Sequence, residues 1–298
     1  MATTQHTAAA GGPSVTLVIG SGSVKCAAAI GVVKVLAEAG IRVERVVGCS
    51  GGALFATLIA QGHDADTARD MTIRLWTAEI AAKRNLRALF SAIAPKLLGF
   101  AAQRFGLRDD RLINRRLREV FGDRRIEDMP IPLHITATNF MDGELVELSS
   151  GPVAPAIRAS LAIPFAFSPV EIDGKLLVDG YVSDPLPISV AMKHGARVIV
   201  AVGFESPMME RIGSAGRFAM QFSSIMSNNL LRARYAFHSV AHHAEVITII
   251  PEFQQRIRLF DTEKVPYIID AGADAAREQI AYLRRLLAQD AAAGTSGA

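Results

Sequence analysis

The sequence predicts an α/β protein of three layers, α/β/α, in which a mostly parallel central sheet is covered by helices and interrupted by helical insertions. Two observations carry this prediction. Short apolar, β-branched runs stop at glycines, and most of them are followed by a segment with helical spacing. This alternation is typical of parallel sheets with helices on both faces. The chain has 298 residues, 50% of them hydrophobic, which is enough to bury a sizeable core.

The first strand–helix unit lies near the N-terminus. Ser14–Ile19 is a short apolar run and predicts a buried strand. Gly20–Ser23 predicts a loop, and Cys26–Ala39 has helical spacing that ends at Gly40, as a C-terminal cap would. A second unit follows directly, with a strand at Arg42–Val47, a tight glycine-rich turn and a helix at 53–60.

The rest of the chain continues in this manner without an internal repeat or a recognisable linker. We therefore expect one domain over residues 14–290, with disordered tails at 1–13 and 291–298. The predicted elements are a long helical region at 65–121 broken at Pro95 and Gly99, strands at 133–138 and 145–148, a helix at 154–161, a hairpin at 170–178, a helix at 188–194, a strand at 197–202, a mostly helical stretch at 209–244, a strand at 246–250 and a helix at 271–288.

Composition excludes several classes of protein. Charged residues are only 20% of the chain and the formal net charge is +3, so neither a disordered protein nor a nucleic-acid-binding protein is indicated. Cys26 and Cys49 show no metal-ligand spacing and form no disulfide framework, which favours a reducing cytoplasm. The first thirteen residues lack the features of a signal peptide, and no run of apolar residues is long enough for a spanning helix.

The tight turn Gly48-Cys-Ser-Gly-Gly52 contains the strongest single motif. A Gly-x-Ser-x-Gly sequence between a strand and a helix forces a sharp reversal that exposes the serine hydroxyl. The N-terminus of the following helix points toward that hydroxyl. Ser50 is therefore the candidate nucleophile, with Gly48 and Gly52 as the small residues that let the turn close. The alternative is an ordinary β–α turn whose serine caps the helix.

The residues do not identify a histidine base for Ser50. Seven histidines are present, but each is interpreted as a surface or packing residue, and no spacing of histidines and carboxylates supports a metal. Asp179 follows the apolar run 176–178 and precedes Gly180, where a strand ends. Sites in open α/β sheets gather at strand ends, so Asp179 is a candidate base, with a plain Asp-Gly turn as the equal alternative.

The loop after the first strand is a candidate oxyanion hole. Successive backbone N–H groups in the loop Gly20–Lys25 could hold a developing negative charge beside the turn at Ser50. The loop does not match a dinucleotide fingerprint, because Val24-Lys25-Cys26 stands where the third glycine is needed, and it lacks the Gly-Lys-Ser/Thr of a P-loop. A flexible connector is the alternative.

Four blocks together resemble the patatin-like phospholipase family over roughly residues 16–250. They are the loop and helix from Gly20, the Ser50 turn, the stretch Ala156–Val170 and the block Leu177–Pro187. The resemblance implies a patatin-like fold and a Ser50–Asp179 dyad without histidine, in which Asp179 accepts the Ser50 proton and Gly180 supports it. It also implies that the backbone of Gly22, Ser23 and Val24 holds the oxyanion. An acyl-enzyme would form, and the substrate would be a lipid acyl ester with no cofactor.

The chain departs from the family pattern in its loop and beside Asp179. The family usually has three glycines, then x-Arg-Gly; here Ser21 and Ser23 replace two of the glycines, Lys25 takes the arginine position and Cys26 the final glycine. Lysine keeps the charge of arginine but loses its planar fork. Tyr181 stands where glycine or alanine is usual, which puts a ring beside the dyad.

Two segments are candidates for contact with lipid. Trp76–Arg108 mixes basic and apolar residues and is either a membrane-surface helix or an ordinary surface helix. Phe218–Phe237 is either a lid or acyl groove, or part of the core or a subunit interface. The sequence thus favours a cytoplasmic lipid acyl hydrolase with peripheral membrane contact. A catalytically weak lipid-binding protein and an acyltransferase using the same dyad are the alternatives, and oligomeric state is left open.

Overall fold

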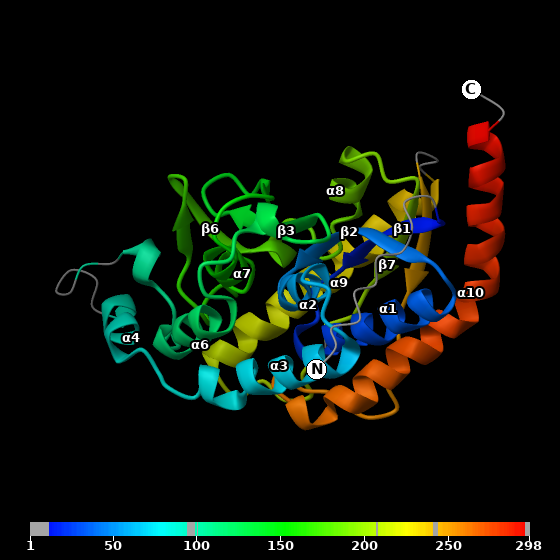
Figure 1. The fold of residues 1–298 in the computed structure, drawn as a ribbon. Helices are drawn as coiled ribbons and strands as arrows, with labels where there is room; N and C mark the ends of the chain where they lie inside the picture. Colours follow the sequence, from blue (N-terminus) through cyan, green and yellow to red (C-terminus); the bar gives the residue numbers. More distant parts are fainter. Residues whose placement is uncertain (1–11, 94–98, 100, 207, 241–243, 296–298) are drawn as a thin grey trace.

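The computed structural model describes residues 12–93, 99, 101–206, 208–240 and 244–295. Within these residues, eight strands form one sheet in the order β5-β6-β3-β2-β1-β7-β8, with β4 added on β3 (Figure 1). The strands are β1 (Ser14–Ile19), β2 (Arg42–Cys49), β3 (Leu133–Asn139), β4 (Leu145–Leu148), β5 (Val170–Ile172), β6 (Lys175–Asp179), β7 (Val198–Val202) and β8 (Glu245–Ile249).

Pairing is parallel through β3-β2-β1-β7-β8, whereas β4, β5 and β6 join by antiparallel pairing. The helices are α1 (Ala28–Glu38), α2 (Gly51–Ala60), α3 (Ala65–Leu75), α4 (Leu86–Ile93), α6 (Arg111–Phe121), α7 (Val153–Ser160), α8 (Ile188–Lys193), α9 (Ala215–Val240) and α10 (Val265–Thr295). The predicted class, an α/β protein with a mostly parallel sheet between helices, is confirmed.

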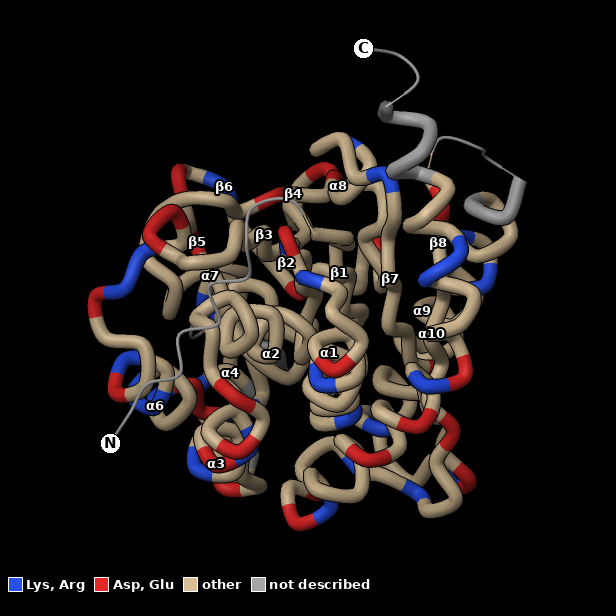
Figure 2. Tube along the Cα trace, turned by 45° about the vertical axis from the view of Figure 1, so that its right-hand side comes forward, with Lys and Arg blue, Asp and Glu red and all other residues tan. Residues whose placement is uncertain are grey.

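The side chains of β1 show how the sheet separates two cores. Leu17 and Ile19 are fully buried on the face covered by α1, α2 and α10, whereas Val18 is fully buried on the other face with residues of α8 and with Leu231 of α9. Such alternation follows from the two-residue period of a strand, and burial on both faces requires the continuous apolar run seen in the sequence. Figure 2 shows charge of both signs on the peripheral helices α3, α6 and α10 and none on α2.

Helices α1 and α10 approach each other closely through glycines. A Cβ on Gly31 would overlap the backbone oxygen of Ile269, and one on Gly272 would overlap that of Ala28. The two helices lie side by side along one flank of the molecule (Figure 1). The absence of a side chain at both positions lets the backbones touch, which holds the end of the chain against the first helix.

The boundaries of several elements differ from the sequence prediction. Helix α10 begins at Val265 instead of 271, because Pro266 is tolerated in a first turn whose N–H groups have no helical partner. It also continues to Thr295, into the region predicted as a tail, because the alanines at 291–293 favour helix. The predicted helical region 65–121 is divided into α3, α4, α6 and short 3₁₀ turns. Of the two predicted tails, residues 1–11 and 296–298 lie outside the described residues.

We predict that Gly31→Ala lowers the free energy of unfolding by about 1–3 kcal/mol or more, because the added methyl forces α1 away from α10. Gly216→Ala is the matched control. Gly216 lies in α9 with no atom within 4 Å of its ideal Cβ, so this substitution is expected to be neutral or stabilising. Urea denaturation of the two variants measures the difference; equal midpoints would contradict the close helix contact.

Candidate active site

Ser50 lies at the reversal between β2 and α2. Its backbone has φ 55° and ψ −127°, in a region that residues other than glycine rarely adopt, and this costs on the order of 1–3 kcal/mol. The surrounding turn has no space for larger residues: a Cβ on Gly48 would lie 2.6 Å from that of Ala56, and one on Gly52 would lie 2.6 Å from the Gly20 carbonyl oxygen. The strain and the tight packing together direct the Ser50 side chain out of the turn, at the N-terminus of α2.

Asp179 is the last residue of β6, and antiparallel pairing with β3 brings it to Ser50. The Ser50 hydroxyl donates a hydrogen bond of 2.7 Å to Asp179 Oδ2, and the Tyr181 N–H donates one of 3.1 Å to Oδ1. Gly180 is required here because a Cβ would lie 2.7 Å from the Thr136 carbonyl oxygen. The sequence predicted that these residues lie together, and the structure places them in contact.

The electrostatic environment of Asp179 favours its protonated form. Its side chain is 0% exposed, and burial raises its pKa to about 7, against the opposing effect of the hydrogen bonds from Ser50 and Tyr181. A carboxyl group with such a pKa exchanges protons near neutral pH. Since Ser50 is only 6% exposed, the proton that the two residues share is largely screened from water.

Ser160 is a residue of this site to which the sequence assigned no role. Its hydroxyl accepts a 2.8 Å hydrogen bond from the Ser50 N–H and donates one of 2.7 Å to the Thr136 carbonyl oxygen on β3. The end of α7 therefore ties the strained turn to the strand that also pairs with β6. Ser160 lies inside the block Ala156–Val170 that resembles the family, which was the one indication in the sequence. The spacing of a serine in a helix does not show which residue it bonds.

The 20–24 loop packs directly against the turn at Ser50. A Cβ on Gly51 would lie 2.7 Å from the backbone nitrogen and Cα of Ser23, so the two backbones nearly touch. The N–H groups of Gly20 and Ser21 are occupied by the carbonyls of Val202 and Pro185. By contrast, those of Ser23 and Val24 begin a 3₁₀ helix (Ser23–Ala27) and have no carbonyl partner among the described residues.

The serines in this loop fit it in different ways. Ser23 has φ 55°, a conformation that favours glycine, and its hydroxyl donates a hydrogen bond to the Leu259 carbonyl oxygen. Gly22 has φ 176°, which any residue adopts, but a Cβ there would lie 2.6 Å from the Phe204 ring. Packing therefore requires glycine at 22, while a side-chain hydrogen bond offsets the conformational cost at 23.

Lys25 and Cys26 form their hydrogen bonds with residues other than Ser50 and Asp179. The Lys25 ammonium group donates to the Glu205 carbonyl oxygen at 3.0 Å and lies 6.0 Å from the Phe253 ring centroid. Burial lowers the pKa of Lys25 and raises that of Cys26, whose thiol donates to the Gly20 carbonyl oxygen. These contacts hold the loop in place, so Lys25 supports it through Glu205 and Phe253.

Helix α9 presents apolar side chains to solvent close to Asp179. Tyr181, next to the Asp-Gly pair, has a hydrogen bond with Ser223 of α9, and burial raises the pKa of its hydroxyl to about 12. On the same helix, Phe218 is 65%, Phe222 60% and Met226 55% exposed. These three residues recur at intervals of four and share one helix face, so the outer face of α9 is apolar, not only the face toward the core.

The predicted basic helix 76–108 is in fact short helical pieces, of which α4 exposes Leu86 and Phe90. Residues 94–98 and 100 of that segment lie outside the described residues. No helix among the described residues is both long and apolar enough to cross a lipid bilayer.

The histidines are not near Ser50 in the described contacts, but two of them meet elsewhere. His134 of β3 and His194, which follows α8, both hydrogen-bond the same oxygen of Glu147 on β4. The sequence spacing did not indicate this cluster, because its members are separated by a hairpin and by the whole Asp179 block.

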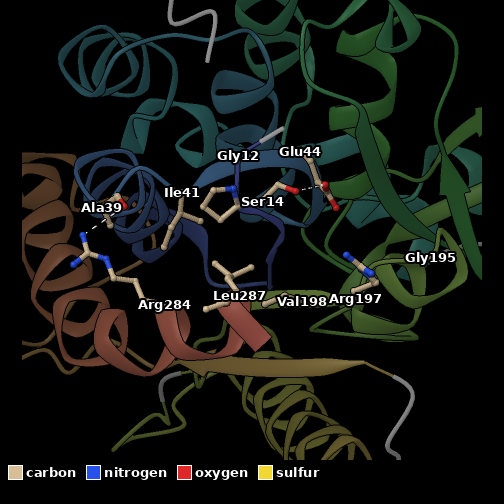
Figure 3. A pocket seen from close by; sticks show the side chains of 12 residues that line it. Gly12, Ser14, Ala39, Ile41, Glu44, Gly195, Arg197, Val198, Arg284 and Leu287 are labelled. Atoms are coloured by element: carbon tan, nitrogen blue, oxygen red, sulfur yellow. Dashed lines mark hydrogen bonds between the residues drawn. The ribbon is translucent and has the colours of Figure 1, made fainter. Parts of the chain in front are cut away.

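The surface pocket in Figure 3 lies at the amino ends of the parallel strands, whereas Ser50 lies at their carboxyl ends. It has a volume of about 640 Å³ and is lined by the starts of β1 and β7, at Ser14 and Val198, and by Arg284 and Leu287 of α10. Ser50 follows the carboxyl end of β2, which runs parallel to β1, so this pocket does not belong to the candidate active site.

Ser50 and Asp179 thus form a hydrogen-bonded serine–carboxylate pair, each at the carboxyl end of its own strand. The model of the patatin-like phospholipase family matches residues 17–192, more than half of the chain. The protein therefore belongs to the patatin-like phospholipase family.

Among its relatives, an uncharacterized NTE family protein of Mycobacterium tuberculosis is 33% identical over 190 residues, which are 64% of this chain and 49% of the relative. Patatin-like phospholipase domain-containing protein 7 of the rat is 27% identical over 64% of this chain and 14% of its own length. The matched part thus spans about half or less of these relatives. VipD of Legionella pneumophila has a TM-score of 0.49 at 15% identity, covering 91% of this chain and 67% of that structure.

We predict that Ser160→Ala destabilises the protein by about 1–3 kcal/mol, because the Ser50 N–H loses its buried acceptor. If Ser50 acts as a nucleophile, kcat also falls while KM stays nearly constant, since only the turn is disturbed. Ser160→Thr retains the hydroxyl and is the rescue variant. Denaturation curves and steady-state kinetics measure the two effects; an unchanged stability would contradict the bracing role.

Proposed function

We propose that this protein hydrolyses acyl esters of lipids through Ser50 and Asp179. The observation that carries the proposal is the 2.7 Å hydrogen bond from the Ser50 hydroxyl to a buried carboxylate. Family membership supports the substrate class, and the apolar outer face of α9 beside the Asp179 block supports contact with an aggregated lipid.

In the proposed first half-reaction, Ser50 Oγ attacks the ester carbonyl carbon while Asp179 Oδ2 accepts the hydroxyl proton. In this proposal the N–H groups of Ser23 and Val24, with Gly22 before them, and the N-terminus of α2 stabilise the oxyanion. Asp179 then donates the proton to the leaving alcohol as the C–O bond breaks, which leaves an acyl group on Ser50.

In the second half-reaction, water attacks the acyl-enzyme and Asp179 accepts its proton. The tetrahedral intermediate collapses, Ser50 Oγ recovers the proton, and the free fatty acid leaves. General-base assistance of this kind contributes about 10²- to 10⁴-fold in rate. Because Asp179 must alternate between base and acid, a pKa near neutrality serves both steps.

We expect Ser50→Ala and Asp179→Asn each to lower kcat/KM by at least about 10³-fold, because each removes one participant of a unit that acts together. Hydrolysis of a short p-nitrophenyl ester and release of fatty acid from phospholipid vesicles measure the loss. Ser91→Ala, on α4, is the matched control and should retain full activity.

Labelling with a fluorophosphonate followed by peptide mapping identifies the nucleophile independently of turnover. Modification of Ser50 in wild type and its loss in Ser50→Ala are the expected results. Activity that survives in Ser50→Ala would refute the proposal. Unlabelled Ser50 together with retained vesicle binding would instead favour a catalytically weak lipid-binding protein, and transfer to an added alcohol would favour an acyltransferase.

The proposal also predicts a pH dependence. Only the deprotonated carboxylate accepts the Ser50 proton, so kcat/KM should rise with pH and level off above about 7, the raised pKa of Asp179. Asp184 is the control group: burial raises its pKa to about 6, but it pairs with Arg234 and not with Ser50. Asp184→Asn should therefore show the same rise of kcat/KM with pH as wild type. A wild-type kcat/KM that does not fall below about pH 7 would contradict the role of Asp179.

A further inference from the structure

The three side chains His134, Glu147 and His194 form a cluster that the proposed reaction does not use. They come from three elements: β3, β4 and the end of α8. His134 Nδ1 lies 2.8 Å and His194 Nε2 lies 2.5 Å from the same oxygen, Glu147 Oε1. The two ring centroids lie 4.2 Å apart, and the ring planes are tilted by 34° to each other.

We propose that His134 Nδ1, His194 Nε2 and Glu147 Oε1 form a binding site for a divalent transition-metal cation such as Zn²⁺. The three ligand atoms lie within 4.8 Å of one another, so small outward movements bring each to the 2.0–2.2 Å bond lengths typical of Zn–N and Zn–O. Two imidazoles and one carboxylate are a donor set that suits zinc and excludes Mg²⁺ and Ca²⁺, which prefer oxygen ligands alone.

Convergence on one oxygen gives the site its shape. With neutral rings, the two N–H protons both lie in the space between the nitrogens and Glu147 Oε1. A cation takes that space when each ring moves its proton to its other nitrogen, so binding neutral imidazoles releases no proton. The metal then replaces two hydrogen bonds by three coordinate bonds, and water completes the coordination from the open side.

Neighbouring side chains hold the ligands in position without using their metal-binding atoms. Lys193 Nζ lies 2.9 Å from the other Glu147 oxygen, Oε2, and leaves Oε1 directed at the histidines. Arg45 donates a 2.9 Å hydrogen bond to the His194 carbonyl oxygen and fixes the backbone at the end of α8. Partners of this kind orient metal ligands in proteins, although the two positive charges oppose the cation and lower its affinity.

The burial of the three residues leaves one route to the site. The His134 side chain is 9% exposed and that of Glu147 13%, whereas that of His194 is 31% exposed. A cation thus enters past His194. Once bound, it would connect the β3–β4 hairpin to α8, the helix that follows the Asp179 block, and act as a structural clamp across the sheet.

Isothermal titration of metal-free protein with ZnCl₂ tests the site, together with thermal unfolding in the presence and absence of the ion. We expect one equivalent bound with a dissociation constant of about 1 µM or tighter, and a raised unfolding temperature. His194→Gln and Glu147→Gln should each weaken binding by at least ~10-fold. His63→Ala, at a histidine outside the cluster, should bind as wild type does.

Substitution by Co²⁺ gives a readout that does not depend on stability. The visible absorption of the bound ion should indicate four-coordination in wild type and be lost in His194→Gln. This variant is chosen because the His194 side chain is partly in solvent, so its substitution disturbs the fold least. Binding that is equal in wild type and both cluster variants would place zinc elsewhere and overturn the proposal. Absence of binding to folded wild type at 100-fold excess zinc would also overturn the proposal. The three side chains would then form only a hydrogen-bonded ion-pair network.

Discussion

The hydrogen bond between Ser50 and Asp179 joins two residues that are 129 positions apart, and the middle of the sheet is arranged around it. Strand β3 is the element on which this contact depends. It pairs in parallel with β2, which precedes Ser50, and in antiparallel fashion with β6, which ends at Asp179. A change of register by one residue between β3 and β6 would turn the carboxylate to the opposite face.

Several side chains of β3 and its neighbours hold this arrangement. Thr138 donates a 2.9 Å hydrogen bond to the Asp179 carbonyl oxygen, and Ser160 connects the Ser50 backbone to Thr136. The strained backbone of Ser50 therefore lies inside a network whose members are buried and mutually bonded. Strain of this kind persists only where the surrounding structure over-determines it, which is the case here.

The electrostatics and the packing of the site have a common origin. Burial raises the pKa of Asp179 because its carboxylate lacks water, and that burial exists because glycines at 180 and at 51–52 let backbones approach closely. Helix α9 contacts the Asp179 block through Arg234 and Asp184 and keeps apolar side chains such as Phe222 in solvent, a state that is costly unless they meet lipid or another apolar partner. His134 of the His134–Glu147–His194 cluster lies on the same β3, two residues before Thr136, so a ligand at the cluster would stabilise the strand on which both Ser50 and Asp179 depend.

By itself, the sequence determined the fold class, most of the strands and the candidate nucleophile Ser50. Buried strands can be recognised in the sequence because a strand covered on both faces must be apolar throughout. The Ser50 turn can be recognised because glycine alone permits its close contacts. The sequence also located Asp179, through the block that resembles the family. Only the tertiary structure decided the register that brings Asp179 to Ser50, the bond from Ser160 to the turn, the outward apolar face of α9 and the meeting of two histidines on Glu147. These depend on contacts between residues distant in the chain, which no local spacing encodes.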